Sequence, residues 1–128
     1  MTVDIFALCD FAQDNNGKLT IVGVYNSILV KKTPFTRSMY LVARLYFDRN
    51  EVGKSHKIKI SIIDEKNQSP LIKPIENELP LEDGKEGVFC NLIFELGNFA
   101  FPSDGIYNFK LSVDDKERSL SLNVRFAN

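Results

Sequence analysis

The sequence predicts one all-β domain spanning residues 1–128, built as a two-sheet antiparallel sandwich of about eight strands. Three observations predict it. Apolar and polar residues alternate with a period of two in most segments, and turn-forming residues recur about every 8–12 positions. No apolar stripe with helical spacing extends beyond about two turns. An immunoglobulin-like Greek key or a jelly roll accommodates this number of strands.

The clearest strand pair is at the C-terminal end of the chain. Between Gly105 and Val113 every second residue is apolar, and the same alternation returns after the turn formed by Asp114, Asp115 and Lys116. Because successive side chains of a strand point to opposite faces, one parity of each strand is expected in the core. The expected core residues of this hairpin are Tyr107, Phe109, Leu111, Val113, Leu120, Leu122, Val124 and Phe126.

Three strands with the same alternation are expected in the middle of the chain. Their core-facing residues are Leu41, Ala43, Leu45 and Phe47, then Ile58, Ile60 and Ile62, whose parity His56 shares, and then Val88, Cys90, Leu92, Phe94 and Leu96. The opposite face of the first of these strands is unusually apolar for a face that stays in water.

A hairpin is expected at the N-terminal end. Its first strand runs through Phe11, and the Asn-Gly pair at 16–17 is the strongest short signal for a hairpin turn, because both positions tolerate a positive φ. The return strand is expected over residues 19–30, with a bulge or break at Gly23 or Asn26.

Residues 65–87 allow two interpretations. Pro70, Pro74 and Pro80 each lack a backbone N–H, so the segment does not fit a central strand. It forms either an edge strand, with its prolines turned away from the neighbouring strand, or a loop. The edge-strand interpretation is favoured by four apolar residues that keep one parity, Leu71, Ile75, Leu79 and Leu81.

Residues 101–109, Phe-Pro-Ser-Asp-Gly-Ile-Tyr-Asn-Phe, resemble the tyrosine corner of immunoglobulin-like sandwiches. The resemblance implies that the hydroxyl of Tyr107 bonds to nearby backbone. The position of the second core cysteine of antibody domains holds Phe109, and the chain has no tryptophan. The resemblance therefore supports an architecture, not an ancestry.

A second pattern covers nearly the whole chain. It begins with Ile-Phe-Ala-Leu-Cys-Asp-Phe-Ala-Gln at 5–13, continues with Gly-Lys-Leu at 17–19 and Gly-Val-Tyr at 23–25, and ends with the hairpin that starts at 101. In this pattern the chain resembles a family of small, uncharacterised bacterial β-sandwich proteins whose domain has no known function. The resemblance implies a bacterial source and a sandwich fold, and it carries no activity.

Composition limits the classes of partner. Sixteen basic and 17 acidic residues leave a net charge of −1, whereas nucleic-acid binders usually carry a basic excess, so no nucleic-acid partner is expected. The N-terminal segment has no signal-peptide pattern, and no apolar run approaches the ~20 residues needed to span a bilayer. We therefore expect a cytoplasmic protein with no membrane partner, whose thiols Cys9 and Cys90 are reduced and behave as small hydrophobes.

No motif predicts catalysis, a metal site or a cofactor. His56 is the sole histidine, shares parity with three isoleucines, and is expected to be a partly buried or solvent-facing residue at a strand start. The acidic and amide residues at 14–16 and Asp10 are expected to form turns, since no EF-hand register fits them. Glycines are scattered at turns and form no phosphate-binding loop. No catalytic, metal-binding or cofactor-binding residue is assigned.

One predicted surface is more apolar than a solvent-facing sheet face usually is. Apolar residues occupy the outward parity of two predicted strands, and contiguous exposed apolar surface usually marks an interface. The candidate interface residues are Tyr40, Val42, Tyr46, Phe89 and Ile93. The alternative is that a loop, or the 65–87 segment, covers this face.

The sequence thus favours a non-enzymatic protein-interaction or structural module, which could bind a partner or form a homo-oligomer through this face or a strand edge. One alternative is a binder of a small carbohydrate or lipid ligand, built on the same aromatic residues. The other is an enzyme that uses a pair of carboxylates, although spacing along the chain pairs none.

Overall fold

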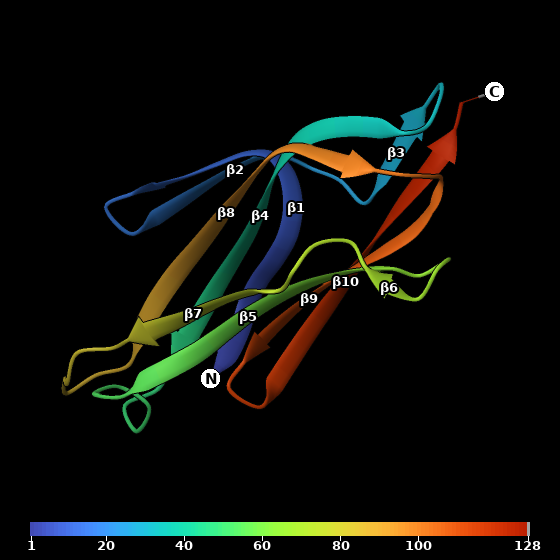
Figure 1. Ribbon diagram of the computed structural model, residues 1–128. Coiled ribbons are helices and arrows are strands. Elements are labelled where there is room, and N and C mark those ends of the chain that lie inside the picture. Colours follow the sequence, from blue (N-terminus) through green and yellow to red (C-terminus); the bar gives the residue numbers. More distant parts are fainter. Residues whose placement is uncertain (128) are drawn as a thin grey trace.

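Two β-sheets pack face to face in the computed structural model, which describes residues 1–127 (Figure 1). Among these residues no helix is long and apolar enough to cross a membrane. The strands are β1 (Thr2–Asn15), β2 (Lys18–Val24), β3 (Ser27–Val30), β4 (Phe35–Phe47), β5 (Ser55–Asp64), β6 (Ser69–Pro70), β7 (Ile75–Pro80), β8 (Val88–Phe101), β9 (Gly105–Val113) and β10 (Lys116–Phe126). The all-β prediction is confirmed, with two more strands than expected because two short ones, β3 and β6, stand apart.

The first sheet has the order β2-β1-β4-β8, and the second has the order β3-β10-β9-β5-β6, with β7 also paired to β5. All pairs are antiparallel except β3 with β10, which is parallel. The second sheet is therefore mixed, which corrects the expectation of purely antiparallel sheets. Alternation along a strand reports which face is buried, but it does not report the direction of a distant partner.

The parallel pair arises where the chain changes sheets. The predicted return strand, residues 19–30, is broken after Val24, so that β2 stays in the first sheet and β3 joins the second. At the break the Tyr25 N–H donates to the Leu8 carbonyl (3.0 Å), and the Asn123 N–H donates to the Asn26 carbonyl (2.9 Å). These bonds hold one residue of the crossing to each sheet. Of the two predicted break points, Asn26 marks the crossing. Gly23 has φ +69° but makes no bulge, because the β1–β2 register is the same on both sides of it, with Cys9 opposite Val24 and Phe11 opposite Val22.

The core fills the space between the two sheets. The expected inward parity is confirmed on β4, β5 and β9, where the inward residues of all three strands are at most 5% exposed. Phe126 differs from its prediction and is 48% exposed. It lies beyond Val124, the last residue of β10 that pairs with β9, so it has a neighbouring strand on one side only, β3.

The uncertain 65–87 segment lies at an edge of the second sheet. Its strand β7 pairs antiparallel with β5 and ends on Pro80, opposite Ser55. The edge-strand interpretation is therefore right for β7, while most of the remaining segment is loop. The four same-parity residues Leu71, Ile75, Leu79 and Leu81 all pack against the core.

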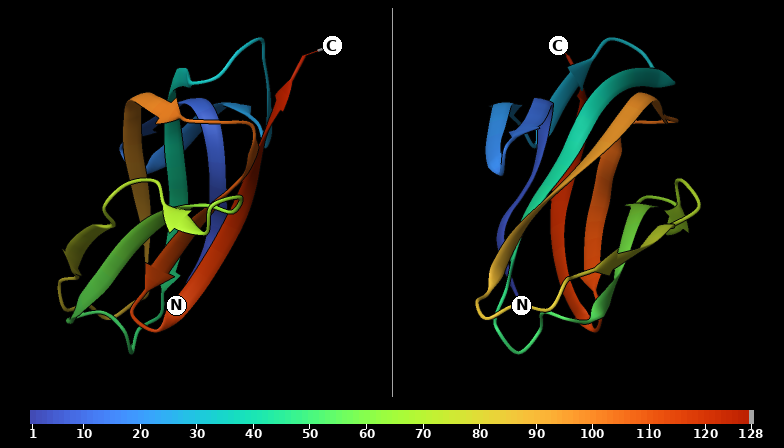
Figure 2. Two further views of the ribbon diagram at one scale, coloured as in Figure 1. Left: turned by 45° about the vertical axis from the view of Figure 1, so that its right-hand side comes forward. Right: turned by 90° about the vertical axis from the view of Figure 1, so that its left-hand side faces the viewer.

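The hairpin turn at 16–17 is confirmed, since Asn16 and Gly17 have φ values of +53° and +83°. Its first strand is longer than predicted and reaches Asn15. Cys9 is the last residue of β1 that pairs with β4, so the distal part of the β1–β2 hairpin leaves the edge of β4. Figure 2 shows this hairpin curling to the side of the first sheet that faces away from the second.

Candidate functional site

The five candidate interface residues lie on the outer face of the first sheet. The register of β4 and β8 places Tyr46 opposite Phe89 and Val42 opposite Ile93, with Tyr40 opposite Glu95. The sequence pattern therefore identified one continuous row of neighbouring side chains. The structure divides this row into a covered half and an exposed half.

The β1–β2 hairpin covers half of the row. Val42 has no exposed surface and forms a small second core with Cys9 and Ala12. The partly buried residues that pack against this core are Ala7, Leu19, Ile21, Tyr40 and Ile93. Val42 is therefore a buried packing residue rather than part of an open interface, and Ile93 is half-buried beside it. The cover is the hairpin, and neither a loop nor the 65–87 segment supplies it.

Asn91 fastens the hairpin to β8. Its side-chain amide donates to Asp14 Oδ2 and to the Gly17 carbonyl, both at 3.2 Å, and its Oδ1 accepts from Arg44 Nη1 at 3.1 Å. A polar residue on the outer parity of β8 gave no sign of this role in the sequence, because its two partners on the hairpin lie more than 70 residues earlier.

The exposed half of the row is a small aromatic cluster, defined here as Tyr46, Phe89 and Arg44. Phe89 is 55% exposed, its ring centroid lies 4.8 Å from that of Tyr46, and the Arg44 guanidinium lies 4.3 Å above it. Gly87 closes over Tyr46, since a Cβ at this position would overlap the phenol ring and approach the Phe47 carbonyl oxygen to 2.7 Å. The cluster is thus a fixed apolar surface that water reaches.

Tyr40 lies at the other end of the row, beside the hairpin. Its ring packs edge-on against Phe11, with centroids 5.5 Å apart, and Phe11 is itself 42% exposed. Burial and then the nearby Glu95 carboxylate raise the pKa of the Tyr40 phenol. Glu95 has no cationic side chain within 4.0 Å in the part of the chain that the structure describes.

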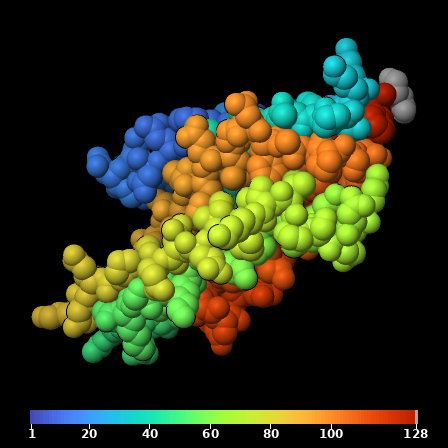
Figure 3. Space-filling model, viewed as in Figure 1, coloured from blue at the N-terminus to red at the C-terminus, as the bar shows by residue number. Residues whose placement is uncertain are grey.

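Strand β8 ends the first sheet and pairs only with β4. Its inward residues Leu92 and Phe94 are only partly buried, whereas their partners on β4, Ala43 and Leu41, are at most 1% exposed. A groove of about 290 Å³ separates β8 from β7, lined by Ile58, Asn77, Glu78, Leu79 and residues 91–94. In Figure 3 the gold atoms of β8 lie set back between the blue hairpin and the yellow-green β7.

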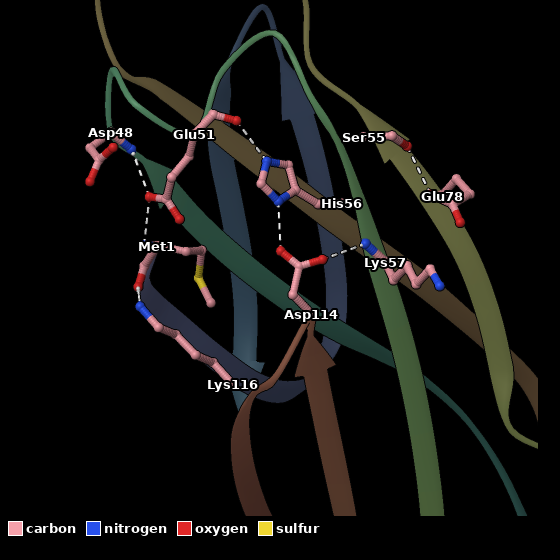
Figure 4. A network of polar contacts seen from close by, with 9 residues as sticks. All are labelled: Met1, Asp48, Glu51, Ser55, His56, Lys57, Glu78, Asp114 and Lys116. Carbon is pink, nitrogen blue, oxygen red and sulfur yellow. Dashed lines mark hydrogen bonds and ion pairs between the residues drawn. The ribbon is translucent and has the colours of Figure 1, made fainter.

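A network of polar contacts centred on His56 lies away from this face (Figure 4). The ring is buried, packs on Phe47 with centroids 4.6 Å apart, and contacts two oxygens at 2.7 Å, Asp114 Oδ2 at Nδ1 and the Glu51 carbonyl at Nε2. Because a carbonyl and an ionised carboxylate only accept, both ring nitrogens donate and the ring is an imidazolium. Burial lowers the His56 pKa, but the bonds to Asp114 and Glu51 outweigh burial and raise it.

The network around His56 extends to the chain start. The Met1 amine donates to Glu51 Oε1 at 2.6 Å, and the Lys116 ammonium donates to the Met1 carbonyl at 3.3 Å. Since both nitrogens of His56 are already bonded within the protein, the ring has no free position for proton transfer to a substrate. The predicted strand start at His56 is confirmed, but the ring is buried rather than partly buried or solvent-facing. The sequence also missed Asp114, whose carboxylate comes from the distant β9–β10 turn.

Both cysteines are free thiols, Cys9 buried and Cys90 half-buried, and burial raises the pKa of each. Within residues 1–127, no group of three or more His, Cys, Asp or Glu side chains is arranged to hold a metal ion.

The comparisons with known proteins identify a family without assigning an activity. No curated protein is significantly similar to the chain. No solved structure is significantly similar either. Residues 4–125 match the family described as "Family of unknown function (DUF6941)", and because this match spans nearly the whole chain, the protein belongs to that family.

Proposed function

We propose that the protein is a non-enzymatic interaction module that binds another protein through the β8 edge and the aromatic cluster beside it. The observation that carries the proposal is that β8, a 14-residue edge strand, presents unpaired backbone groups next to the exposed Phe89. Exposed edges with apolar side chains are ready templates for pairing with another chain.

A comparison of the sheet edges supports this choice. Proteins usually protect an edge strand with short length, prolines, charges or a bulge. The edge strands β3 and β6 have four and two residues, β2 has seven and begins with Lys18, and β7 ends on Pro80 and carries Glu76 and Glu78. Between Val88 and Phe101, β8 has one charged residue and no proline. An irregularity interrupts its pairing with β4 near Asn98, but the nine residues from Val88 to Leu96 pair in unbroken register. This stretch is the longest regular edge in the described part of the chain.

The site geometry favours a protein over a small carbohydrate or lipid ligand. Tyr46 and Phe89 pack against each other, and Gly87 lies over the Tyr46 ring, so the rings form a filled surface. Ligand pockets are concave and enclose most of the ligand surface. Three depressions on the molecule, of about 290–500 Å³, are lined by neither Tyr46 nor Phe89.

We further propose that the fold is immunoglobulin-like. The order β10-β9-β5-β7 in one sheet and β1-β4-β8 in the other supports it, since it parallels the G-F-C-C′ and A-B-E strands of that fold. The Tyr107 hydroxyl, which donates to the Ser103 carbonyl at 2.6 Å, supports it as well. In this correspondence the strand next to β8 is missing, which fits an edge left for a partner.

The test is capture of protein partners with three forms of the chain. Phe89→Lys places a charge on the aromatic cluster, and Ile106→Lys makes the same change at a residue of similar exposure on the outer face of the second sheet. We expect at least one protein to be retained by wild type and by Ile106→Lys, to be lost with Phe89→Lys, and to bind in the same pattern when purified. Equal capture by all three forms, or no saturable binding by the purified candidates, refutes the proposal.

A further inference from the structure

We propose that β8 accepts an extended segment of a partner protein as a fifth strand of the first sheet, and that this segment carries a basic residue opposite Glu95 and small apolar residues on its inward face. The inference rests on the proposed function and adds the mode of binding and the chemistry of the partner. Strand addition of this kind gives affinity through main-chain hydrogen bonds and specificity through alternate side chains.

The inward face of the added strand has a prepared space. The groove between β8 and β7 exposes Leu92 and Phe94 on one side and Leu79 on the other, and these apolar residues are only partly buried. A water molecule takes about 30 Å³ of liquid. The groove volume of about 290 Å³ is therefore that of about ten water molecules, each roughly the size of one heavy atom with its hydrogens. This suits about two or three small aliphatic side chains. Side chains that fill the groove would bury the inward residues of β8 as fully as those of β4 are already buried.

The outward face of the added strand meets two different neighbours. Glu95 and Phe89 share the outer parity of β8 and stand six positions apart, and both are exposed. Opposite charges and apolar pairs stabilise directly opposed positions on neighbouring strands. A segment of about seven residues with lysine or arginine at one end and an apolar residue at the other matches this pattern.

A second copy of this chain fits the edge less well. Figure 3 shows atoms of β8 between the projecting β1–β2 hairpin and β7, and these projections would obstruct the β8 edge of a second copy. Strand β8 also contains no lysine or arginine that could face Glu95 of another copy. The geometry and charge therefore favour a protruding segment of a different protein.

The experiment selects linear 12-residue peptides from a random phage-displayed library against the full chain. We expect the enriched peptides to alternate apolar and polar residues and to contain lysine or arginine. Glu95→Lys is expected to weaken the selected peptides about tenfold, and selection against it is expected to enrich acidic residues instead. The matched control, Glu117→Lys, reverses an exposed carboxylate on β10 and is expected to change affinity less than twofold.

Backbone pairing is tested with wild-type protein alone, which removes any concern about folding of the variants. The best peptide is made in two forms, N-methylated at its odd or at its even positions. Only alternate amides of an added edge strand face β8, so one form is expected to lose binding and the other to keep it. Equal behaviour of both forms overturns strand addition.

Two further outcomes also overturn the inference. One is that no peptide is enriched on the wild-type protein over the Glu95→Lys background. The other is that light scattering finds a dimer which Glu95→Lys dissociates, which would make a second copy the occupant. In both cases the Phe89-dependent capture described above still decides the proposed function independently.

Discussion

The charged state of His56 can be tested by replacing its partner, Asp114, with asparagine. Asp114 has φ +54°, a conformation that asparagine adopts more readily than most residues, so the turn is retained. In the variant the amide oxygen accepts from the Lys57 N–H, as Asp114 Oδ1 does at 2.9 Å, and the amide N–H₂ faces Nδ1. Nδ1 must then accept, and the ring becomes neutral while Nε2 still donates to Glu51.

The wild-type protein is expected to lose stability as the pH rises. The His56 pKa is raised above its ordinary value of 6.5 by its two hydrogen bonds, against the opposing effect of burial. A raised pKa means that the folded state binds the proton more tightly, so the contribution is complete below about pH 6.5 and is lost as the pH rises through the folded-state pKa.

The size of the effect follows from the contacts. Hydrogen bonds to charged groups contribute about 1.5–3 kcal/mol. The Asp114 side chain is 44% exposed, so solvent screening reduces this to about 1–2 kcal/mol. The Asp114→Asn variant is expected to be less stable than wild type by this amount near pH 6, and to show no decline above it. Asp115→Asn, in the same turn, is the control and is expected to match wild type.

Two measurements check this reasoning. Urea unfolding between about pH 5.5 and 9 gives the free energy of unfolding for the three forms. Because the chain has one histidine, NMR titration of its imidazole gives a single, unambiguous pKa for the folded state. A wild-type imidazole that titrates below 6.5, or a wild-type stability that does not fall at high pH, refutes the assignment of an imidazolium.

Four further substitutions test the packing and the tyrosine corner. Val42→Ala is expected to lower the free energy of unfolding by about 2 kcal/mol, because the residue is fully buried under the hairpin. Phe89→Ser is expected to lower it by less than about 1 kcal/mol, because Phe89 is exposed. Urea unfolding that ranks the two variants the other way contradicts the division of the row into a covered and an exposed half. Asn91→Ala is expected to speed amide hydrogen exchange throughout the distal hairpin, and unchanged exchange means that its bonds do not fasten the tip. Tyr107→Phe is expected to cost about 1–2 kcal/mol in thermal unfolding, since the Ser103 carbonyl loses a buried donor, and an unchanged midpoint argues against the corner.

Local pattern predicted the strands and their buried faces well. The period-two alternation of β5 and β9 identified their inward residues, and the Asn-Gly pair at 16–17 identified the hairpin turn. These features depend on neighbours within a few residues, which the sequence displays directly. The direction of β3 against β10 depends on a pairing across about 96 positions, as between Ser27 and Asn123, and no local feature reports it.

The same limit explains the candidate interface. Parity placed Val42 and Phe89 on one outer face, and both do lie there. Whether an outward residue meets water depends on what folds over it, and the hairpin reaches Val42 only because β1 leaves β4 after Cys9. The partners of His56 were missed for a related reason, because the Asp114 carboxylate becomes its neighbour only when β9 pairs with β5.

The boundary between the covered and the exposed surface of the first sheet explains why a partner would bind along the β8 edge. The apolar inward residues of the hairpin pack on Val42 and Ile93. The side chain of Asn91 holds the hairpin tip in this position by hydrogen bonding to it. The main chain of β8 is thereby left unpaired along the edge, although its side chains are partly covered. Peptide groups exposed at an edge bond to water without fixing any one sequence, so main-chain pairing supplies affinity there. Discrimination among partners then falls to the few side chains on that edge that remain open, and Phe89 and Glu95 are the two that differ most in chemistry.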